Sequence, residues 1–153
     1  MTGRTGPSDP GPVVIVHHIQ HVRRAVAAAV AAERPVTLLS APDAAAAIGP
    51  AVFQSMIEAV LAENPPMSTG IATGINAVID CGSDPGHALK ALREGCTRLR
   101  IDADDTVLAK LRDMAGADGL VLAGDPLSAL DLSDPLNTDA VLLDWLEEPA
   151  ARH

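Results

Sequence analysis

Residues 77–86, with the sequence AVIDCGSDPG, constrain the fold more than any other stretch of the chain. Small and apolar residues lead to Asp80 and Cys81, a Gly-Ser-Asp turn follows, and Pro85 suits the first position of a helix. This pattern predicts a buried parallel strand that leaves its sheet through a sharp turn into a helix. Because ligands of α/β proteins bind at the carboxyl ends of such strands, Asp80 and Cys81 mark a candidate site.

The same order of strand and helix recurs along the chain. Short apolar runs predict five strands, at residues 13–16, 36–39, 77–80, 98–102 and 120–123. Apolar residues three and four apart predict helices, at residues 19–33, 44–48, 50–63, 85–95, 105–115 and 138–148. This alternation predicts an α/β domain with a parallel sheet and right-handed crossovers. Two architectures fit: a half-barrel resembling part of a (βα)8 barrel, and an open doubly wound three-layer sheet.

Composition divides the chain into three parts. Residues 1–12 are rich in proline and glycine, which predicts a disordered N-terminal arm. Residues 13–124 carry all five expected strands and form the predicted α/β domain. Residues 125–153 form an acidic tail with a short amphipathic helix, since Arg152 is their only basic residue besides a terminal histidine. Within the domain, the loop at residues 64–76 is the best candidate for a mobile segment.

The overall composition excludes several classes of partner. The net charge is −9 and aromatic residues make up only 1% of the chain, which argues against a nucleic-acid partner. No run of about 18 apolar residues occurs, so no membrane span is expected. No basic segment followed by an apolar one opens the chain, so we expect a cytoplasmic protein. Its two cysteines, Cys81 and Cys96, are too few for a disulfide framework and are expected to be reduced.

Strand ends converge at one edge of a parallel sheet, so side chains from different strands are expected to meet there. Three protein ligands with one open position make a catalytic metal site, and thiolate, imidazole and carboxylate groups all bind zinc. The candidate ligands near these strand ends are Cys81, His17, His18 and Asp102. The structural alternative is that Asp80 ties down a turn beside a small buried Cys81 thiol, with solvated histidines.

Two arginines on the fourth predicted strand are candidates to bind an anion. Arg98 and Arg100 fall on one face of the fourth strand because side chains alternate along a strand. Together with Ser40, they are candidates to bind a small anionic ligand. Internal pairing with Asp80 or Asp102 is the alternative, because guanidinium groups inside a sheet need partners.

Several segments, in this order and approximate spacing, resemble the first half of a class II fructose-bisphosphate aldolase barrel. They are the sequence PVTLLS at residues 35–40, Gly49, the helix that runs to Ala62, VID at residues 78–80, Gly82, GCT at residues 95–97, and Ile101 with Asp102. The resemblance spans four βα units, from about residue 13 to residue 102, and extends more weakly to residue 124. It implies a half-barrel fold in which Asp80 is the proton-transfer group. Cys81 stands where the family has a zinc-binding histidine.

These observations lead to a ranked set of functions. Because the family's second barrel half has no counterpart here, we expect a degenerate, non-catalytic half-barrel that binds a partner or small anionic ligand, without a cofactor. The alternative is a metal-dependent lyase of aldolase type, acting with zinc on a phosphorylated or carboxylated small molecule. A signalling module ranks third, because no acidic pair ends the first strand and no lysine ends the fifth. A half-barrel exposes sheet edges, so we also expect a homodimer.

Overall fold

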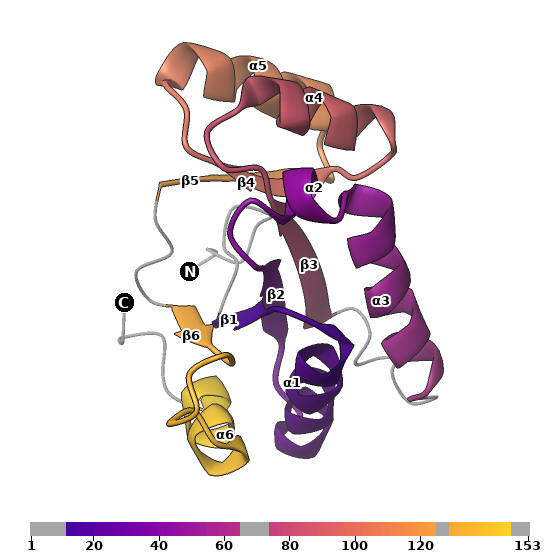
Figure 1. Ribbon diagram of the computed structural model, residues 1–153, viewed down its shortest axis with the longest axis vertical. Coiled ribbons are helices and arrows are strands. Elements are labelled where there is room, and N and C mark those ends of the chain that lie inside the picture. Colours follow the sequence, from indigo (N-terminus) through magenta and orange to yellow (C-terminus); the bar gives the residue numbers. More distant parts are fainter. Residues whose placement is uncertain (1–11, 65–73, 125–128, 148–153) are drawn as a thin grey trace. The chain divides into compact units, whose positions relative to one another are not determined.

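The computed structural model describes residues 12–64, 74–124 and 129–147 (Figure 1). The predicted N-terminal arm, apart from Pro12, and most of the predicted mobile loop lie outside these residues. The described residues divide into two compact units. Unit 1 holds residues 40–54 and 78–124. Unit 2 holds residues 12–39, 55–64, 74–77 and 129–147.

Strands and helices alternate over the described residues, as the sequence predicts. The strands are Val13–Val16 (β1), Val36–Ser40 (β2), Ile75–Asp80 (β3), Arg98–Ile101 (β4), Leu120–Ala123 (β5) and Ala129–Asp131 (β6). The helices are Ile19–Ala32 (α1), Ala44–Ala47 (α2), Pro50–Ala62 (α3), Pro85–Arg93 (α4), Asp105–Ala115 (α5) and Asp139–Glu147 (α6). The strands are parallel and follow the order β5-β4-β3-β2-β1-β6.

The α/β class with a parallel sheet is therefore confirmed, whereas the expected number of strands was wrong. The described residues contain a sixth strand, β6, inside the segment predicted to be an acidic tail. Its three residues, Ala-Leu-Asp, are too few to show an alternating pattern. They form a strand because they pair in parallel with β1, with Val13 opposite Ala129. The predicted domain limits at residues 125 and 153 stay a prediction.

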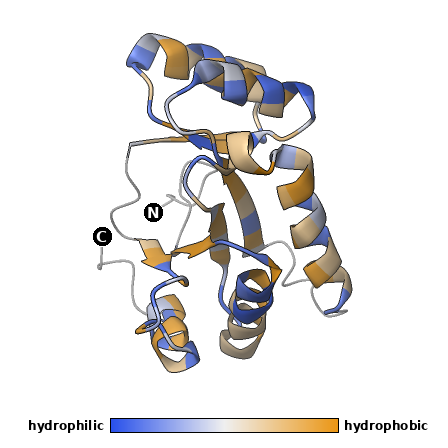
Figure 2. Ribbon diagram, viewed as in Figure 1, coloured by the Kyte–Doolittle hydropathy of each residue, from blue (hydrophilic) through white to orange (hydrophobic). Residues whose placement is uncertain are grey.

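In unit 1, β3, β4 and β5 form a parallel ladder next to α4 and α5. Ile79 is paired with Leu99 and Asp80 with Arg100, so one face of the strand pair is aliphatic and the other carries charge. The two helices contact each other and their neighbouring strands, and both show polar and apolar residues in alternation (Figure 2). Asp84 caps α4 by accepting a hydrogen bond from the Gly86 amide, as its position before Pro85 predicts.

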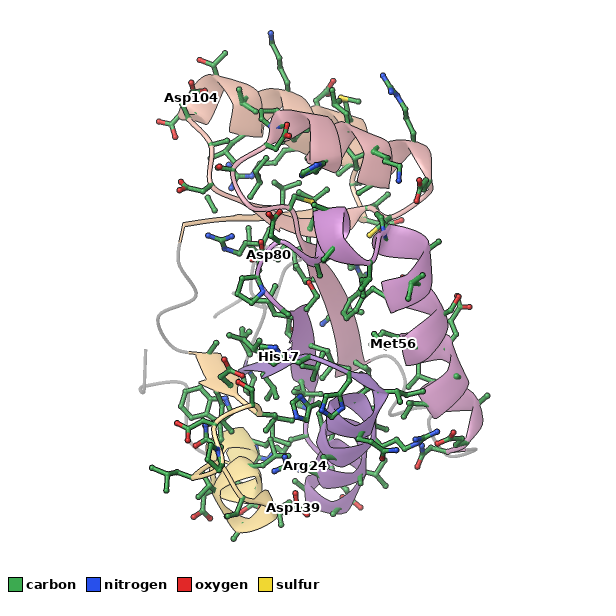
Figure 3. The ribbon with its side chains drawn as sticks, viewed as in Figure 1. His17, Arg24, Met56, Asp80, Asp104 and Asp139 are labelled. Carbon is green, nitrogen blue, oxygen red and sulfur yellow. The ribbon has the colours of Figure 1, made fainter. Side chains whose placement is uncertain are left out.

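In unit 2, α1 and α6 pack together beside the β1–β6 pair. Alanine and valine residues spaced three and four apart fill the buried side of α1, which allows close approach. The Trp145 indole Nε1 donates a hydrogen bond to the Val13 carbonyl, 3.1 Å away, and so ties α6 to β1. Arg24 of α1 pairs with Asp139 of α6 at 2.7 Å, as Figure 3 shows.

The buried core of the described residues is aliphatic, with Phe53 as its one buried phenyl ring. No helix within residues 12–64, 74–124 and 129–147 is long and apolar enough to cross a membrane.

Candidate functional site

Asp80, the last residue of β3, forms a buried ion pair in unit 1, and Figure 3 labels its position. Its side chain is buried, with 4% of the residue exposed. Oδ1 accepts hydrogen bonds from the backbone amides of Asp43, at 3.0 Å, and Gly82, at 2.8 Å. Oδ2 accepts one from Arg100 Nη1 at 2.9 Å. Both carboxylate oxygens are thus used by the protein itself.

Arg100 extends this set of contacts to a third and a fourth strand. It lies on β4, is 8% exposed, and donates from Nε to the Gly124 carbonyl just after β5, at 2.6 Å. Asp80 and Arg100 form an ion pair, and Asp80 also accepts hydrogen bonds from the turns that follow β2 and β3. A buried ion pair of this kind requires good geometry and further hydrogen bonds to offset its desolvation, and both are present here.

Ser40 joins the same group from the end of β2. Its Oγ accepts a hydrogen bond from the Asp80 amide at 2.8 Å, and its hydroxyl donates to the Ala41 carbonyl at 3.2 Å. The structure therefore brings together Ser40, Asp80 and Arg100, three of the residues that the sequence selects. Their visible contacts are internal. Arg98, two residues before Arg100 on β4, is half-buried and lies opposite Leu120.

The two turns held by Asp80 approach each other closely. Asp43 has a left-handed backbone with φ of 60°, and Gly82 has φ of 64°. A Cβ atom on Gly82 would lie 2.7 Å from Asp43 Oδ1, which the exposed Asp43 side chain can relieve by moving, so the left-handed backbone angle is what favours glycine here. The Gly82 carbonyl also accepts a hydrogen bond from the Asp102 amide at 2.8 Å, which joins the turn after β4.

The turns after β2, β3 and β4 form an acidic rim in unit 1. Exposed carboxylates line it, namely Asp43, Asp84, Asp102, Asp104 and Asp105. Residues 41–43, 81–84 and 102–104 include no lysine or arginine. His87, in the first turn of α4, lies with Nδ1 3.9 Å from Asp43 Oδ1 and Nε2 3.6 Å from Asp84 Oδ2. Sequence reasoning missed Asp43 and His87, because nothing in their spacing marks them as neighbours.

The Cys81 thiol is poorly suited to act as a metal ligand or nucleophile. The residue is fully buried, and burial raises the pKa of its thiol to about 12. Since the thiolate is the reactive and metal-binding form, such a thiol is inert at neutral pH. Burial also raises the pKa of the Cys96 thiol. These properties match the structural alternative for Cys81.

The predicted histidine ligands belong to a different cluster, in unit 2. His17 follows β1, and its Nε2 lies 2.8 Å from Oδ1 of Asp131 at the end of β6. Burial of Asp131 opposes its ionisation, but hydrogen bonds from Ser133 and His17 outweigh this and lower the pKa of the carboxyl. His18 is exposed and its ring stacks on that of His21, with 3.8 Å between the ring centroids.

We find no group of three His, Cys, Asp or Glu side chains placed to hold a metal ion within the residues that the structure describes. The predicted ligands divide between the units, with His17 and His18 in unit 2 and Cys81 and Asp102 in unit 1. The zinc set therefore stays a prediction. No protein-family model, curated protein or solved structure matches the chain.

Proposed function

We propose that this chain is a non-catalytic α/β domain, a degenerate half-barrel of aldolase type, that acts by binding a partner. One observation carries this proposal: both oxygens of the Asp80 carboxylate are already engaged, by Arg100 and by two backbone amides. A general acid or base must reach a substrate proton within hydrogen-bonding distance. A buried carboxylate with three internal donors is arranged to fix turns instead.

The proposal of a half-barrel is supported by the order of five of the six strands. From β5 to β1 the strands follow one another across the sheet as they do in the sequence, which is the order of consecutive strands in a (βα)8 barrel; β6 departs from this order, because it pairs with β1. The lyase alternative needs a metal and a mobile proton. Asp80 binds three internal donors and the Cys81 thiol is fully buried, so neither side chain is placed to reach a substrate.

The acidic rim favours a positively charged partner over an anionic ligand. Arg100 is neutralised by Asp80, and exposed carboxylates surround the turns above it. The whole chain has a net charge of −9, so its field attracts cationic groups and repels anions. We therefore propose a partner that presents lysine or arginine side chains to the rim.

Charge-matched variants test this binding. An oligolysine peptide is titrated into the labelled protein while amide chemical shifts are followed. We expect the largest shifts in residues 41–43, 82–84 and 102–104. Replacing Asp102 and Asp104 by Asn should weaken the binding several-fold. Replacing Asp113 and Asp118 by Asn changes the net charge equally and should leave it nearly unchanged. Equal weakening by both double variants, or no shifts in the rim, would overturn the proposed binding surface.

A second assay tests the absence of catalysis. A ketose phosphate is incubated in deuterated water with the protein and added Zn²⁺, and hydrogen exchange next to its carbonyl is followed by NMR. We expect no exchange above the protein-free control. Exchange that is present in the natural protein and lost in Asp80→Asn, with circular dichroism showing that the variant is still folded, would support the lyase alternative instead.

We also propose that the chain forms a homodimer through an uncharged surface of unit 1. Residues 44–53 contain no charged side chain, and Ile48 and Val52 there are 43% and 51% exposed. Two acidic copies of the chain repel each other least where the contacting surfaces carry no charged side chains. The β5 edge is less suitable, because Arg112 Nη2 covers the Val121 carbonyl at 3.1 Å.

Light scattering at high micromolar concentration tests the dimer. We expect a dimer for the natural chain and a monomer for Val52→Asp. The control is Met114→Asp on α5, where the side chain is 53% exposed, and we expect this variant to remain dimeric. A monomeric natural chain, or a dimer that survives Val52→Asp, would contradict this arrangement.

A further inference from the structure

Three histidines surround the start of α1 in unit 2. His17 precedes the helix, His18 is its N-cap residue, and His21 lies in its first turn. The His21 ring stacks against that of His18 and meets that of His17 edge-on, with centroids 3.8 and 5.7 Å apart. His21 is only 8% exposed. A helix start normally carries acceptors or acidic residues, and the first turn of α1 holds no acidic residue.

The His21 side chain binds the residue before the N-cap in one protonation state only. The backbone amide of His17 donates a hydrogen bond to His21 Nδ1 at 3.0 Å. Nδ1 is therefore the unprotonated nitrogen of a neutral ring, because a ring nitrogen that bears hydrogen cannot accept. Protonation of His21 converts this acceptor into a donor. It leaves the His17 amide without its partner and places a positive charge at the positive end of the helix dipole.

The surroundings of His21 oppose this charge. Burial is the largest influence and lowers the pKa of His21, and His18, His17 and Arg24 lower it further. From β6, Asp131 acts in the opposite direction but does not reverse the shift. From α6, Asp139 is already paired with Arg24. A neutral His21 is thus required by the packing and by the hydrogen bond, and it has a positive neighbour one turn along α1.

We propose that the first turn of α1 is a pH-sensitive element, which detaches from the end of β1 as the solution becomes mildly acidic. The free energy lost comes from His21. The pKa of His21 is lower in the folded than in the unfolded chain, so the folded chain binds fewer protons. Neutral His21 therefore stabilises the closed first turn above the unfolded pKa of about 6.5, and this stabilisation is lost as the pH falls below that value.

The opening is limited to the start of α1, because the contact between His17 and Asp131 persists over the pH range in which His21 titrates. The pKa of Asp131 lies below its ordinary value, so the carboxylate remains ionised while His21 titrates. Its contact with His17 Nε2 is therefore kept, and β6 stays joined to the end of β1. Within residues 17–22, the opening thus exposes the hydrogen-bonded amides of His17, His21 and Val22 and leaves the strand pair in place.

Amide hydrogen exchange between pH 7.5 and 5.0, corrected for the intrinsic rate, tests the proposal. In the natural chain, the opening constant at residues 17–22 should rise by up to about tenfold per pH unit below 6.5, since the open state binds one more proton. His21→Gln retains an acceptor suited to this helix position and should make the opening constant independent of pH. The control His18→Gln, at an exposed position, should keep most of the dependence.

A constant opening in the natural chain, or an equal rise in His21→Gln, would overturn the proposal. Ring titration of the natural chain by NMR provides a second readout that needs no variant. The His21 resonance should titrate below 6.5, and the opening constant at residues 17–22 should rise between 6.5 and that midpoint and level off below it. A midpoint at or above 6.5 for His21 would also overturn the proposal.

Discussion

Asp80 and Arg100 form a buried ion pair, with Oδ2 of the carboxylate 2.9 Å from Nη1 of the guanidinium. Oδ1 of Asp80 and Nε of Arg100 bind backbone groups that follow β2, β3 and β5. Four strand ends of unit 1 are thereby held by two side chains. The arrangement has an energetic consequence: removal of either partner leaves a buried charge, whereas an apolar replacement of both leaves none.

The hydroxyl of Ser40 provides the first test of this account. Ser40→Ala removes the acceptor of the Asp80 amide and leaves a buried donor without a partner. We expect a loss of about 1–3 kcal/mol in the free energy of unfolding, measured in urea. The exposed Ser83 is the matched control, because Ser83→Ala should change stability by less than about 0.5 kcal/mol. Equal effects of the two variants would show that the Ser40 contact contributes nothing specific.

The thiol of Cys81 should be unreactive in the folded protein. With a pKa of about 12, only about one thiol in ten thousand is ionised at pH 8. We expect labelling by a thiol reagent to be very slow in native buffer and rapid in urea, with Cys96→Ser used to isolate the Cys81 signal. Rapid labelling of the native chain would contradict the buried, structural role of Cys81 and reopen the metal-site hypothesis.

The indole of Trp145 should report the docking of α6 on β1. Trp145→Phe keeps an aromatic ring but removes the donor to the Val13 carbonyl, so we expect a loss of about 1 kcal/mol. Because the chain has one tryptophan, the fluorescence of the natural protein follows this contact directly. Its unfolding transition should coincide with that seen by circular dichroism. An earlier fluorescence transition would mean that α6 detaches before the rest of the chain unfolds.

Sequence patterns predicted the elements well where the signal is local. A continuous apolar run located β1 and helical spacing located α5 at the residues where the structure has them, and Asp84 before Pro85 marked the start of α4. Strand β6 could not be found in this way. Three residues carry no period, and their conformation depends on pairing with β1, which is more than 100 residues away in the sequence.

The candidate site was predicted only in part. The rule that strand ends converge predicts Ser40 and Asp80 as neighbours, and the structure has them in contact. It also grouped them with His17 and His18, which lie in the other unit. The partners that decide the role of Asp80 are the backbone amides of Asp43 and Gly82, and no sequence pattern reports these. Pairing of Arg100 with Asp80 had been one of two open alternatives. The link between His17 and Asp131 likewise required the position of β6.

A double-mutant cycle between Asp80 and Arg100 tests the central claim most directly. Asp80→Asn, Arg100→Met and the double variant are compared with the natural chain by urea denaturation. We expect each single change to cost about 3–5 kcal/mol, because it leaves a buried partner uncompensated. The double variant should cost less than the sum of the two by about 2 kcal/mol or more. Additive effects, within about 0.5 kcal/mol, would show that the two side chains are not coupled and would contradict the structural role assigned to Asp80.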